Sequence, residues 1–135
     1  ASSLAGHLNL DNLIVIYDSN DICLDGPVDE CLSEDTKARY ESYGWFVQSI
    51  DGHSFEMIQK AIQKAKSTKK PCLIIAKTVI GKGSPNLAGT SEVHGKAMGP
   101  EEVEKTKNNC GIPLEPTFYI PPSVKFFFEA HFSNG

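Results

Sequence analysis

The chain has 135 residues, of which 40% are hydrophobic and 22% are charged, and its formal net charge at pH 7 is −4. These values are typical of one folded domain, and they argue against a disordered chain and against a nucleic-acid-binding surface. The sequence has no apolar run near the eighteen or so residues that a membrane-spanning helix needs, and we expect no signal peptide. The 4 cysteines are scattered without a CxxC pair, which predicts free thiols, no zinc site and a reducing cytoplasm.

The first residues, ASSLAGHL, lack an initiator methionine and resemble the interior of a helix, so we expect a piece of a longer polypeptide. Within residues 2–9, Leu4, Ala5 and Leu8 share one face, which predicts a helix that ends before Asn9. The apolar and aromatic run Leu13–Tyr17 then predicts a strand that is covered on both faces, as in a parallel sheet between helices.

A polar cluster follows this strand directly. Asp18, Ser19, Asn20 and Asp21 place oxygen-bearing side chains at the carboxyl end of the strand, where ligands bind in open α/β sheets. Such oxygens suit a hard cation such as Mg2+ or Ca2+, and Mg2+ usually keeps substrate phosphates as further ligands. The same residue types form turns and helix caps, which is the more common role for this local pattern alone. Both interpretations stay open at this point.

The middle of the chain predicts alternating helices and strands. The N-cap and acidic residues 33–35 indicate the start of a helix that ends at Gly44, and residues 45–50 resemble a second strand. Ser54 caps a helix with an apolar stripe, and residues 72–76 form a third, buried strand with Cys72 in the core. The expected stripe consists of Phe55, Ile58, Ala61, Ile62 and Ala65. Short links in such an alternation predict an α/β fold, a parallel sheet with flanking helices.

A long glycine-rich segment, residues 78–99, has no apolar period and predicts an ordered loop on the same side of the sheet as Asn20. A short helix should begin at Pro100, with Glu101 and Glu102 in its first turn, and end before Gly111. An extended, proline-marked segment follows, and the apolar residues 124–131 predict a last helix. His53, beside a glycine at a helix entry, is expected to be structural.

Three blocks of the sequence carry a family resemblance. YDSNDICLDG, YGWFVQSIDGHS and PCLIIAKTVIGKGSPNLAGTSEVHGKAMGPEEV resemble the thiamine-diphosphate-binding domain of transketolase, of the bacterial, plant and yeast type. The resemblance implies that residues 1–112 are the C-terminal part of the diphosphate-binding domain and that residues 113–135 are an extended segment and the start of an interdomain linker. The family's GDG aspartate and its pyrimidine-binding domain would then lie outside residues 1–135.

The resemblance also implies roles for single residues. Asn20 would bind the divalent metal through its side-chain oxygen, and Ile22 would bind it through its main-chain carbonyl. His94, in a Val-His-Gly triplet, would approach both the diphosphate and the substrate and would move a proton as a catalytic residue. The expected cofactor-binding residues are Asn20, Leu24, Gly26, Ile80 and His94.

The activity implied is transfer of a two-carbon ketol unit from a ketose phosphate, such as xylulose 5-phosphate, to an aldose phosphate, such as ribose 5-phosphate, in the pentose phosphate pathway. Thiamine diphosphate and Mg2+ or Ca2+ would be the cofactors, and a cytoplasmic homodimer would be the assembly, with no nucleic-acid or membrane partner. Two alternatives remain: another thiamine-diphosphate enzyme such as dihydroxyacetone synthase, or a non-catalytic fragment or assembly module that retains the fold.

Overall fold

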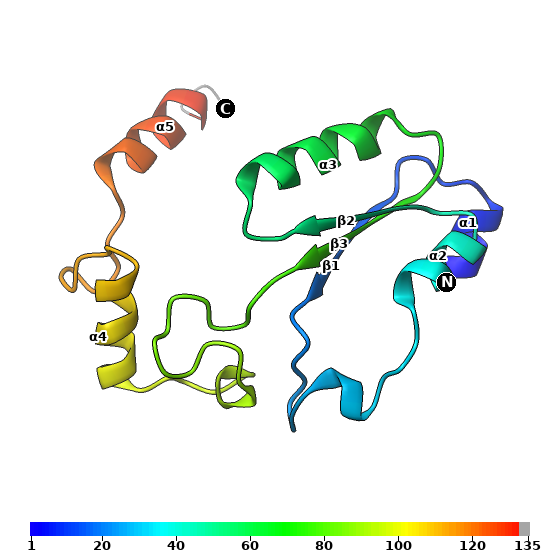
Figure 1. Cartoon of the computed structure of the whole chain (residues 1–135). Coiled ribbons are helices and arrows are strands. Elements are labelled where there is room, and N and C mark those ends of the chain that lie inside the picture. The colour runs from blue at the N-terminus through cyan, green and yellow to red at the C-terminus, as the bar shows by residue number, and fades with distance from the viewer. Residues whose placement is uncertain (133–135) are drawn as a thin grey trace.

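The computed structural model describes residues 1–132, which form an open parallel sheet with helices on both faces (Figure 1). The regular elements in chain order are α1 (Ser2–His7), β1 (Ile14–Ser19), α2 (Thr36–Ser42), β2 (Phe46–Asp51), α3 (Phe55–Ser67), β3 (Cys72–Lys77), α4 (Pro100–Asn109) and α5 (Pro122–Phe132). Two 3-10 turns lie in the connections, at Val28–Glu30 and Ser91–Val93. The predicted α/β fold with a parallel sheet is confirmed.

The three strands are parallel and stand in the order β1-β3-β2. At their amino ends, Ile14 of β1 and Phe46 of β2 both lie opposite Cys72 of β3. At their carboxyl ends, Ser19 and Asp51 both lie opposite Lys77. The carboxyl ends of all three strands therefore meet at one edge of the sheet.

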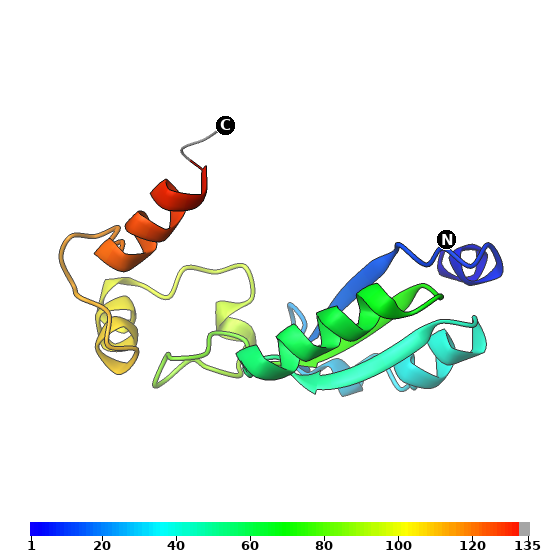
Figure 2. The ribbon, with the colours of Figure 1, turned by 90° about the horizontal axis from the view of Figure 1, so that it is seen from above.

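One face of the sheet is covered by α3. Its Ala61 and Ala65 are buried against Cys72 and Ile74 of β3, and Figure 2 shows α3 lying along the sheet. The small alanine side chains let the helix approach the strand closely. Phe55 was predicted to lie on the same stripe, but it is 89% exposed. It is the first residue of α3, at the carboxyl edge, where the helix projects past the end of β2 (Figure 1).

The opposite face is covered by α1 and α2. Trp45 and Ala5 pack against Leu73, and all three are buried. The indole Nε1 of Trp45 donates a hydrogen bond to the carbonyl of Ser2 at 2.9 Å, and the ring of Tyr40 packs edge to face on it with centroids 5.1 Å apart. The single tryptophan thus joins α1 and α2 to the sheet.

Two expectations for the first third of the chain are corrected. The first strand was expected to be covered on both faces, but Ile16 is 56% exposed, because β1 is an edge strand and the helices lie mainly over β2 and β3. The helix start expected at residues 33–35 falls at Asp35, whose carboxylate accepts a hydrogen bond from the backbone N–H of Ala38 at 2.9 Å. Asp35, and not Ser33, is the N-cap.

The C-terminal third extends beyond the carboxyl edge of the sheet. The loop of residues 78–99 leads to α4, and α5 follows it, away from the strands (Figure 2). The predicted helix over residues 124–131 is confirmed as part of α5, which has no buried residue. Residues 133–135, the end of the expected linker segment, lie outside the described residues. Within residues 1–132, no helix is long and apolar enough to cross a membrane.

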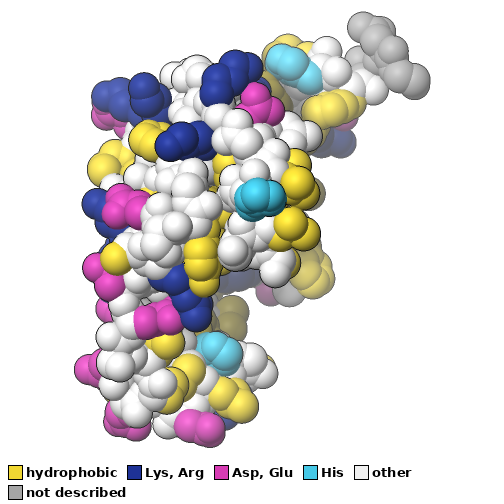
Figure 3. All heavy atoms as spheres, turned by 90° about the vertical axis from the view of Figure 1, so that its right-hand side faces the viewer, with side chains coloured by type: hydrophobic (Ala, Val, Ile, Leu, Met, Phe, Trp, Pro, Cys, Tyr) yellow, Lys and Arg dark blue, Asp and Glu magenta, His cyan; other side chains and the backbone are white. Residues whose placement is uncertain are grey.

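The surface on the side of α1 and α2 carries apolar side chains between lysines, arginines and acids (Figure 3). Leu4 and Leu8, in and just after α1, are 59% and 55% exposed. The lysines of the run 60–70, in contrast, all point to solvent along α3 and its exit, as the sequence predicted. The lysines of α3 and the leucines of the α1 region are therefore both exposed to solvent in this chain.

The N-cap of α3 provides a first testable prediction. Ser54 Oγ accepts a hydrogen bond from the N–H of Met57 at 3.3 Å. We expect Ser54→Ala to lower the free energy of unfolding by about 1 kcal/mol, measured by urea denaturation, and Ser54→Asp to retain it, because aspartate also caps. Ser67→Ala, at the exposed end of the same helix, is the matched control. Equal losses at Ser54 and Ser67 would contradict the capping role.

Candidate functional site

A tight turn follows β1 at the expected ligand residue. The Oδ1 atom of Asn20 accepts a hydrogen bond from the N–H of Ile22 at 3.0 Å, and Asp21 between them has a φ of 63°. This is the turn that a cluster of Asp and Asn residues favours. A carbonyl oxygen has two lone pairs, so the Asn20 side chain keeps one that the turn does not use. The turn-forming role and a metal-binding role are therefore compatible in one residue.

The turn is closed by an isolated antiparallel bridge between Ile22 and Pro27. Its hydrogen bonds are made by the flanking residues: Cys23 N donates to Gly26 O at 2.8 Å, and Val28 N donates to Asp21 O at 2.8 Å. The carbonyl of Ile22 lies outside these two bonds. The turn thus presents two oxygens of the kind that Mg2+ and Ca2+ prefer, one on the Asn20 side chain and one on the Ile22 main chain.

A hollow of about 450 Å3 lies beside this turn, at the carboxyl edge of the sheet. Each of the three strands contributes its last residues or the residues just after it, as the strand order requires. The lining residues are Asn20, Asp21, Ile22, Asp51, His53, Lys77, Thr78, Val79 and Gly89. The structure therefore brings Asn20 and Ile22 together in the crevice where the sheet geometry predicts a ligand.

Hydrogen bonds beyond the strand ends hold this edge in place. Thr78 N donates to Ser19 O at 3.2 Å, Gly52 N donates to Lys77 O at 2.8 Å, and the Thr78 hydroxyl donates to the carboxylate of Asp18. A Cβ atom at Gly52 would lie 2.5 Å from Cγ2 of Thr78 and 3.0 Å from the carbonyl oxygen of Lys77, so a side chain at this position would push the two segments apart. These contacts join the three segments that wall the hollow.

His53 also lines the hollow, although the sequence indicated only a structural role for it. The ring atom Nε2 of His53 accepts a hydrogen bond from the backbone N–H of Val79 at 2.9 Å. The backbone N–H of His53 donates to Asp51 Oδ1 at 2.8 Å. An Nε2 that accepts must leave the ring proton on Nδ1, which defines the neutral tautomer. His53 follows the end of β2 as the polar cluster 18–21 follows β1, so the strand-end rule that indicated this cluster could also have indicated His53.

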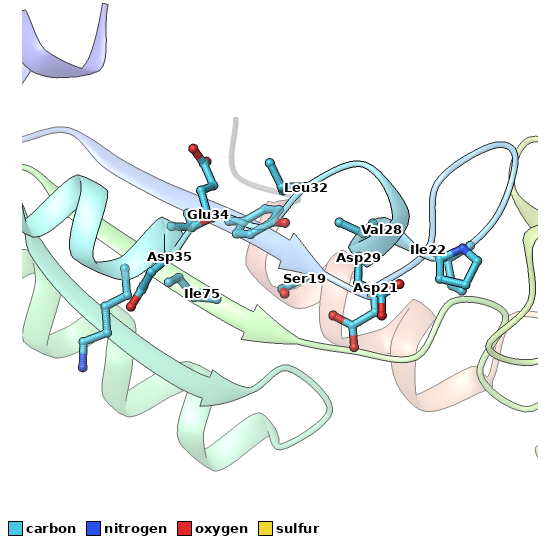
Figure 4. A pocket seen from close by; sticks show the side chains of 13 residues that line it. Ser19, Asp21, Ile22, Val28, Asp29, Leu32, Glu34, Asp35 and Ile75 are labelled. Atoms are coloured by element: carbon cyan, nitrogen blue, oxygen red, sulfur yellow. The ribbon is translucent and has the colours of Figure 1, made fainter.

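A second, larger hollow of about 610 Å3 lies on the other side of the same turn (Figure 4). Asp21 and Ile22 line both hollows, so the turn after β1 is the wall between them. Ile75 of β3 and Leu32 give the second hollow an apolar surface. Its remaining walls come from β1, the turn after it, the segment before α2 and the first residues of α2.

The other expected site residues lie outside both linings. Leu24 is 59% exposed, and Gly26 accepts the bridge hydrogen bond described above. Ile80 lies at the start of the long loop, where its carbonyl accepts a hydrogen bond from Gly89 N at 2.8 Å. His94 is half-buried directly after the turn Ser91–Val93, and its N–H donates to Ser91 O at 3.0 Å. Ile80 is thus one hydrogen bond away from a lining residue, and His94 lies at the other end of the loop.

Glu102 is a buried carboxylate that the sequence indicated only as a first-turn acid. It lies in α4, is 7% exposed, and accepts hydrogen bonds from the Ser84 hydroxyl and from Asn86. The bond from Ser84 and those from the side chain and backbone of Asn86 lower the pKa of this carboxyl to about 2, although burial acts in the opposite direction. Glu102 is therefore ionised at neutral pH.

In the part of the chain that the structure describes, no three His, Cys, Asp or Glu side chains gather in a way that could hold a metal ion. All four cysteines are free thiols, as predicted, and burial raises the pKa of the Cys72 thiol. At the sheet edge, the carboxylates of Asp21 and Asp51 line the hollow together with the Asn20 amide and the Ile22 carbonyl.

An open parallel sheet with a polar turn and a hollow at its carboxyl edge defines a ligand-binding domain of the α/β class. Comparison with known proteins identifies the family of this domain. The family model described as "Transketolase, thiamine diphosphate binding domain" matches residues 1–135, and the chain belongs to this family. The resemblance seen in the sequence is thereby confirmed.

Individual relatives agree with this assignment. The chain is 47% identical over 131 residues to a transketolase of Staphylococcus epidermidis and 52% identical over 126 residues to that of Bacillus subtilis, covering 96% and 92% of this chain. It spans only 20% and 19% of the length of those two relatives.

Solved structures give the same result. The transketolase of Campylobacter jejuni has a TM-score of 0.92 at 46% identity, and that of Pichia stipitis, in complex with sedoheptulose 7-phosphate, has a TM-score of 0.90 at 39% identity. Each comparison covers 96% of this chain and 20% of the solved chain. The fold and family are therefore established for this chain, which spans about one fifth of its full-length relatives.

Proposed function

We propose that this chain is part of a longer, thiamine-diphosphate-dependent transketolase and that it supplies the diphosphate-binding side of the active site. The main support is the turn after β1: its Asn20 and Ile22 offer two oxygens beside a hollow, in a chain of the transketolase family. The substrates proposed are sugar phosphates. The reaction proposed is transfer of a two-carbon ketol unit from a ketose phosphate to an aldose phosphate, as in the pentose phosphate pathway.

The proposed metal is Mg2+ or Ca2+, held by the side-chain oxygen of Asn20 and the carbonyl of Ile22. A diphosphate would complete the coordination, because Mg2+ is commonly held by few protein ligands together with substrate phosphates. The residues present fit this role: Asn20 Oδ1 keeps a lone pair beyond its bond to Ile22, and the bridge to Pro27 does not use the Ile22 carbonyl.

When bound, thiamine diphosphate supplies the carbon nucleophile and the electron sink of the reaction. Leu24, Gly26 and Ile80 are proposed to surround the cofactor, with Leu24 providing apolar contact and Gly26 keeping the backbone close. His94 is proposed to contact both the diphosphate and the substrate, and to hold or move a proton at a sugar hydroxyl or carbonyl oxygen. Such a proton transfer suits an imidazole.

The domain organisation that we propose is the one that the family resemblance implies. Residues 1–112 would form the C-terminal part of the diphosphate-binding domain, and residues 113–135 would be an extended segment and the start of the interdomain linker. We further propose a cytoplasmic homodimer in which the active site is completed by residues outside this chain.

A two-substrate assay tests this proposal. The full-length protein that contains this chain should transfer a ketol unit from xylulose 5-phosphate to ribose 5-phosphate only when thiamine diphosphate and a divalent cation are both present. Treatment with a chelator should abolish the activity, and added Mg2+ should restore it, because the cation neutralises the diphosphate charge. The readout is product formation over time.

Calorimetric titration with thiamine diphosphate, with and without Mg2+, separates the possible failures. Cofactor binding without ketol transfer would contradict the transketolase activity and favour a non-catalytic module. Absence of cofactor binding in the presence of Mg2+ would contradict the site itself.

A further inference from the structure

The buried carboxylate of Glu102 contacts the long loop of residues 78–99 from α4. Its Oε1 atom accepts hydrogen bonds from the Ser84 hydroxyl and from Asn86 N, the latter at 2.9 Å, and its Oε2 atom accepts from Asn86 Nδ2 at 2.8 Å. A carboxylate only accepts hydrogen bonds, and all three groups that face it are donors. Its neighbour in the same turn of α4, Glu101, is exposed.

The contact acts on one turn of the loop. Ser84 is 4% exposed, and its Oγ atom also accepts a hydrogen bond from Leu87 N at 3.0 Å, so residues 84–87 form a closed unit around this hydroxyl. The far end of α4 supports the same region, because Asn109 Nδ2 donates to Gly83 O at 2.8 Å. Residues near both ends of α4 thus hold the same part of the loop, residues 83–86.

The held turn lies between the two loop residues that are proposed to reach the cofactor. On one side, Gly89 N donates to Ile80 O at 2.8 Å. Across the loop, a Cβ atom at Gly81 would lie 2.9 Å from a methyl of Val93, the residue before His94. The start and the end of the loop therefore touch each other, and the 84–87 turn connects them.

We propose that Glu102 is a positioning residue, whose carboxylate holds the 84–87 turn so that Ile80 and His94 face the bound cofactor together. This inference rests on the proposed function of those two residues. Glu102 itself touches neither the hollow nor its lining residues at the sheet edge, and it acts through the loop. Orientation of this kind matters because a displacement of about 1 Å can cost on the order of a hundredfold in rate.

The test compares Glu102→Ala with Glu102→Gln in the full-length protein, and Glu101→Ala is the matched control. Alanine removes all three acceptor bonds. Glutamine keeps one acceptor for Ser84 and Asn86 N, and its amide can donate to Asn86 once the Asn86 side chain rotates by half a turn. We expect kcat to fall by about tenfold or more in Glu102→Ala and by no more than about threefold in Glu102→Gln. Glu101→Ala should match the parent.

A second pair of variants tests the contact itself. Asn86→Asp would place two carboxylates face to face, so its kcat should fall as in Glu102→Ala. Adding Glu102→Gln to Asn86→Asp should restore activity, because the new amide can donate to the new carboxylate. Failure of this rescue, or a loss of melting temperature in Glu102→Ala with kcat unchanged at saturating substrate and cofactor, would overturn the positioning role.

Trypsin provides a measurement that does not depend on activity. Lys82 and Lys96 are exposed in the loop, and Lys64 is exposed in α3. We expect cleavage at the loop lysines to be about fivefold or more faster in Glu102→Ala than in the parent, with cleavage at Lys64 unchanged, because the loop opens locally more often. Unchanged loop cleavage would overturn the inference. Faster loop cleavage in a protein whose parent shows no ketol transfer would instead contradict the proposed function and leave the contact standing.

Discussion

Asn20→Ala is expected to raise the dissociation constant of thiamine diphosphate by about tenfold or more in the presence of Mg2+, which corresponds to about 1.4 kcal/mol. The alanine side chain has no oxygen, so it can neither bind the metal nor accept the hydrogen bond from Ile22 N. Calorimetric titration of the full-length protein measures the effect. Asn20→Asp retains both acceptor functions and should bind the cofactor with near-parental affinity.

Metal-free titration separates the two functions that Asn20→Ala removes. If Asn20 binds the metal, Mg2+ strengthens cofactor binding in the parent but has little effect in Asn20→Ala. If Asn20 only closes the turn, both affinities fall together and the gain from Mg2+ persists, which would contradict the ligand role. Asn12→Ala, an exposed asparagine before β1 at the opposite edge of the sheet, is the matched control and should change neither affinity.

His94→Ala is expected to lower the turnover number by about a hundredfold or more, because proton transfer by a positioned side chain contributes roughly that factor. The dissociation constant of thiamine diphosphate should change much less. Steady-state assay of ketol transfer and cofactor titration on the same protein give the two numbers. Turnover at the parental rate would contradict the proton-transfer role.

Two further substitutions sharpen the His94 result. His94→Gln keeps a hydrogen-bond donor but cannot exchange a proton near neutral pH, so it should be as slow as His94→Ala if proton transfer is what matters. Substantial recovery in His94→Gln would mean that the residue acts as a hydrogen-bond donor only. His7→Ala, in α1 at the far edge of the sheet, should leave turnover unchanged.

The regular elements of the sheet could be predicted because each has a strong local signal. The apolar run before Asp18 and the apolar run after Pro71 both became strands, and Ser54 caps α3 as expected. The errors arise where local signals are equivalent or where burial depends on neighbours. Ser33 and Asp35 are both good N-caps, and Ile16 is apolar like its neighbours but lies on an edge strand.

The candidate site could be predicted only in part, for a similar reason. The polar cluster after the first strand indicated the right edge of the sheet, because strand ends of a parallel sheet share one edge, and the family resemblance then singled out Asn20 within the cluster. The partnership between Glu102 and Asn86 spans 16 residues and depends on how the loop folds back onto α4, which no local pattern encodes. A glutamate in the first turn of a helix is common for electrostatic reasons alone, so its burial could not be distinguished from ordinary exposure in the sequence.

The central position of β3 couples the walls of the crevice to each other. Thr78 extends the ladder toward β1, Lys77 extends it toward β2, and both belong to one continuous backbone. Slippage of β3 by a single residue would exchange its two faces and would misalign both walls simultaneously. The relative positions of the crevice walls therefore depend on the register of β3. Substitutions that weaken the pairing of this middle strand would shift the residues that bind the ligand, even when the substituted residue does not contact the ligand.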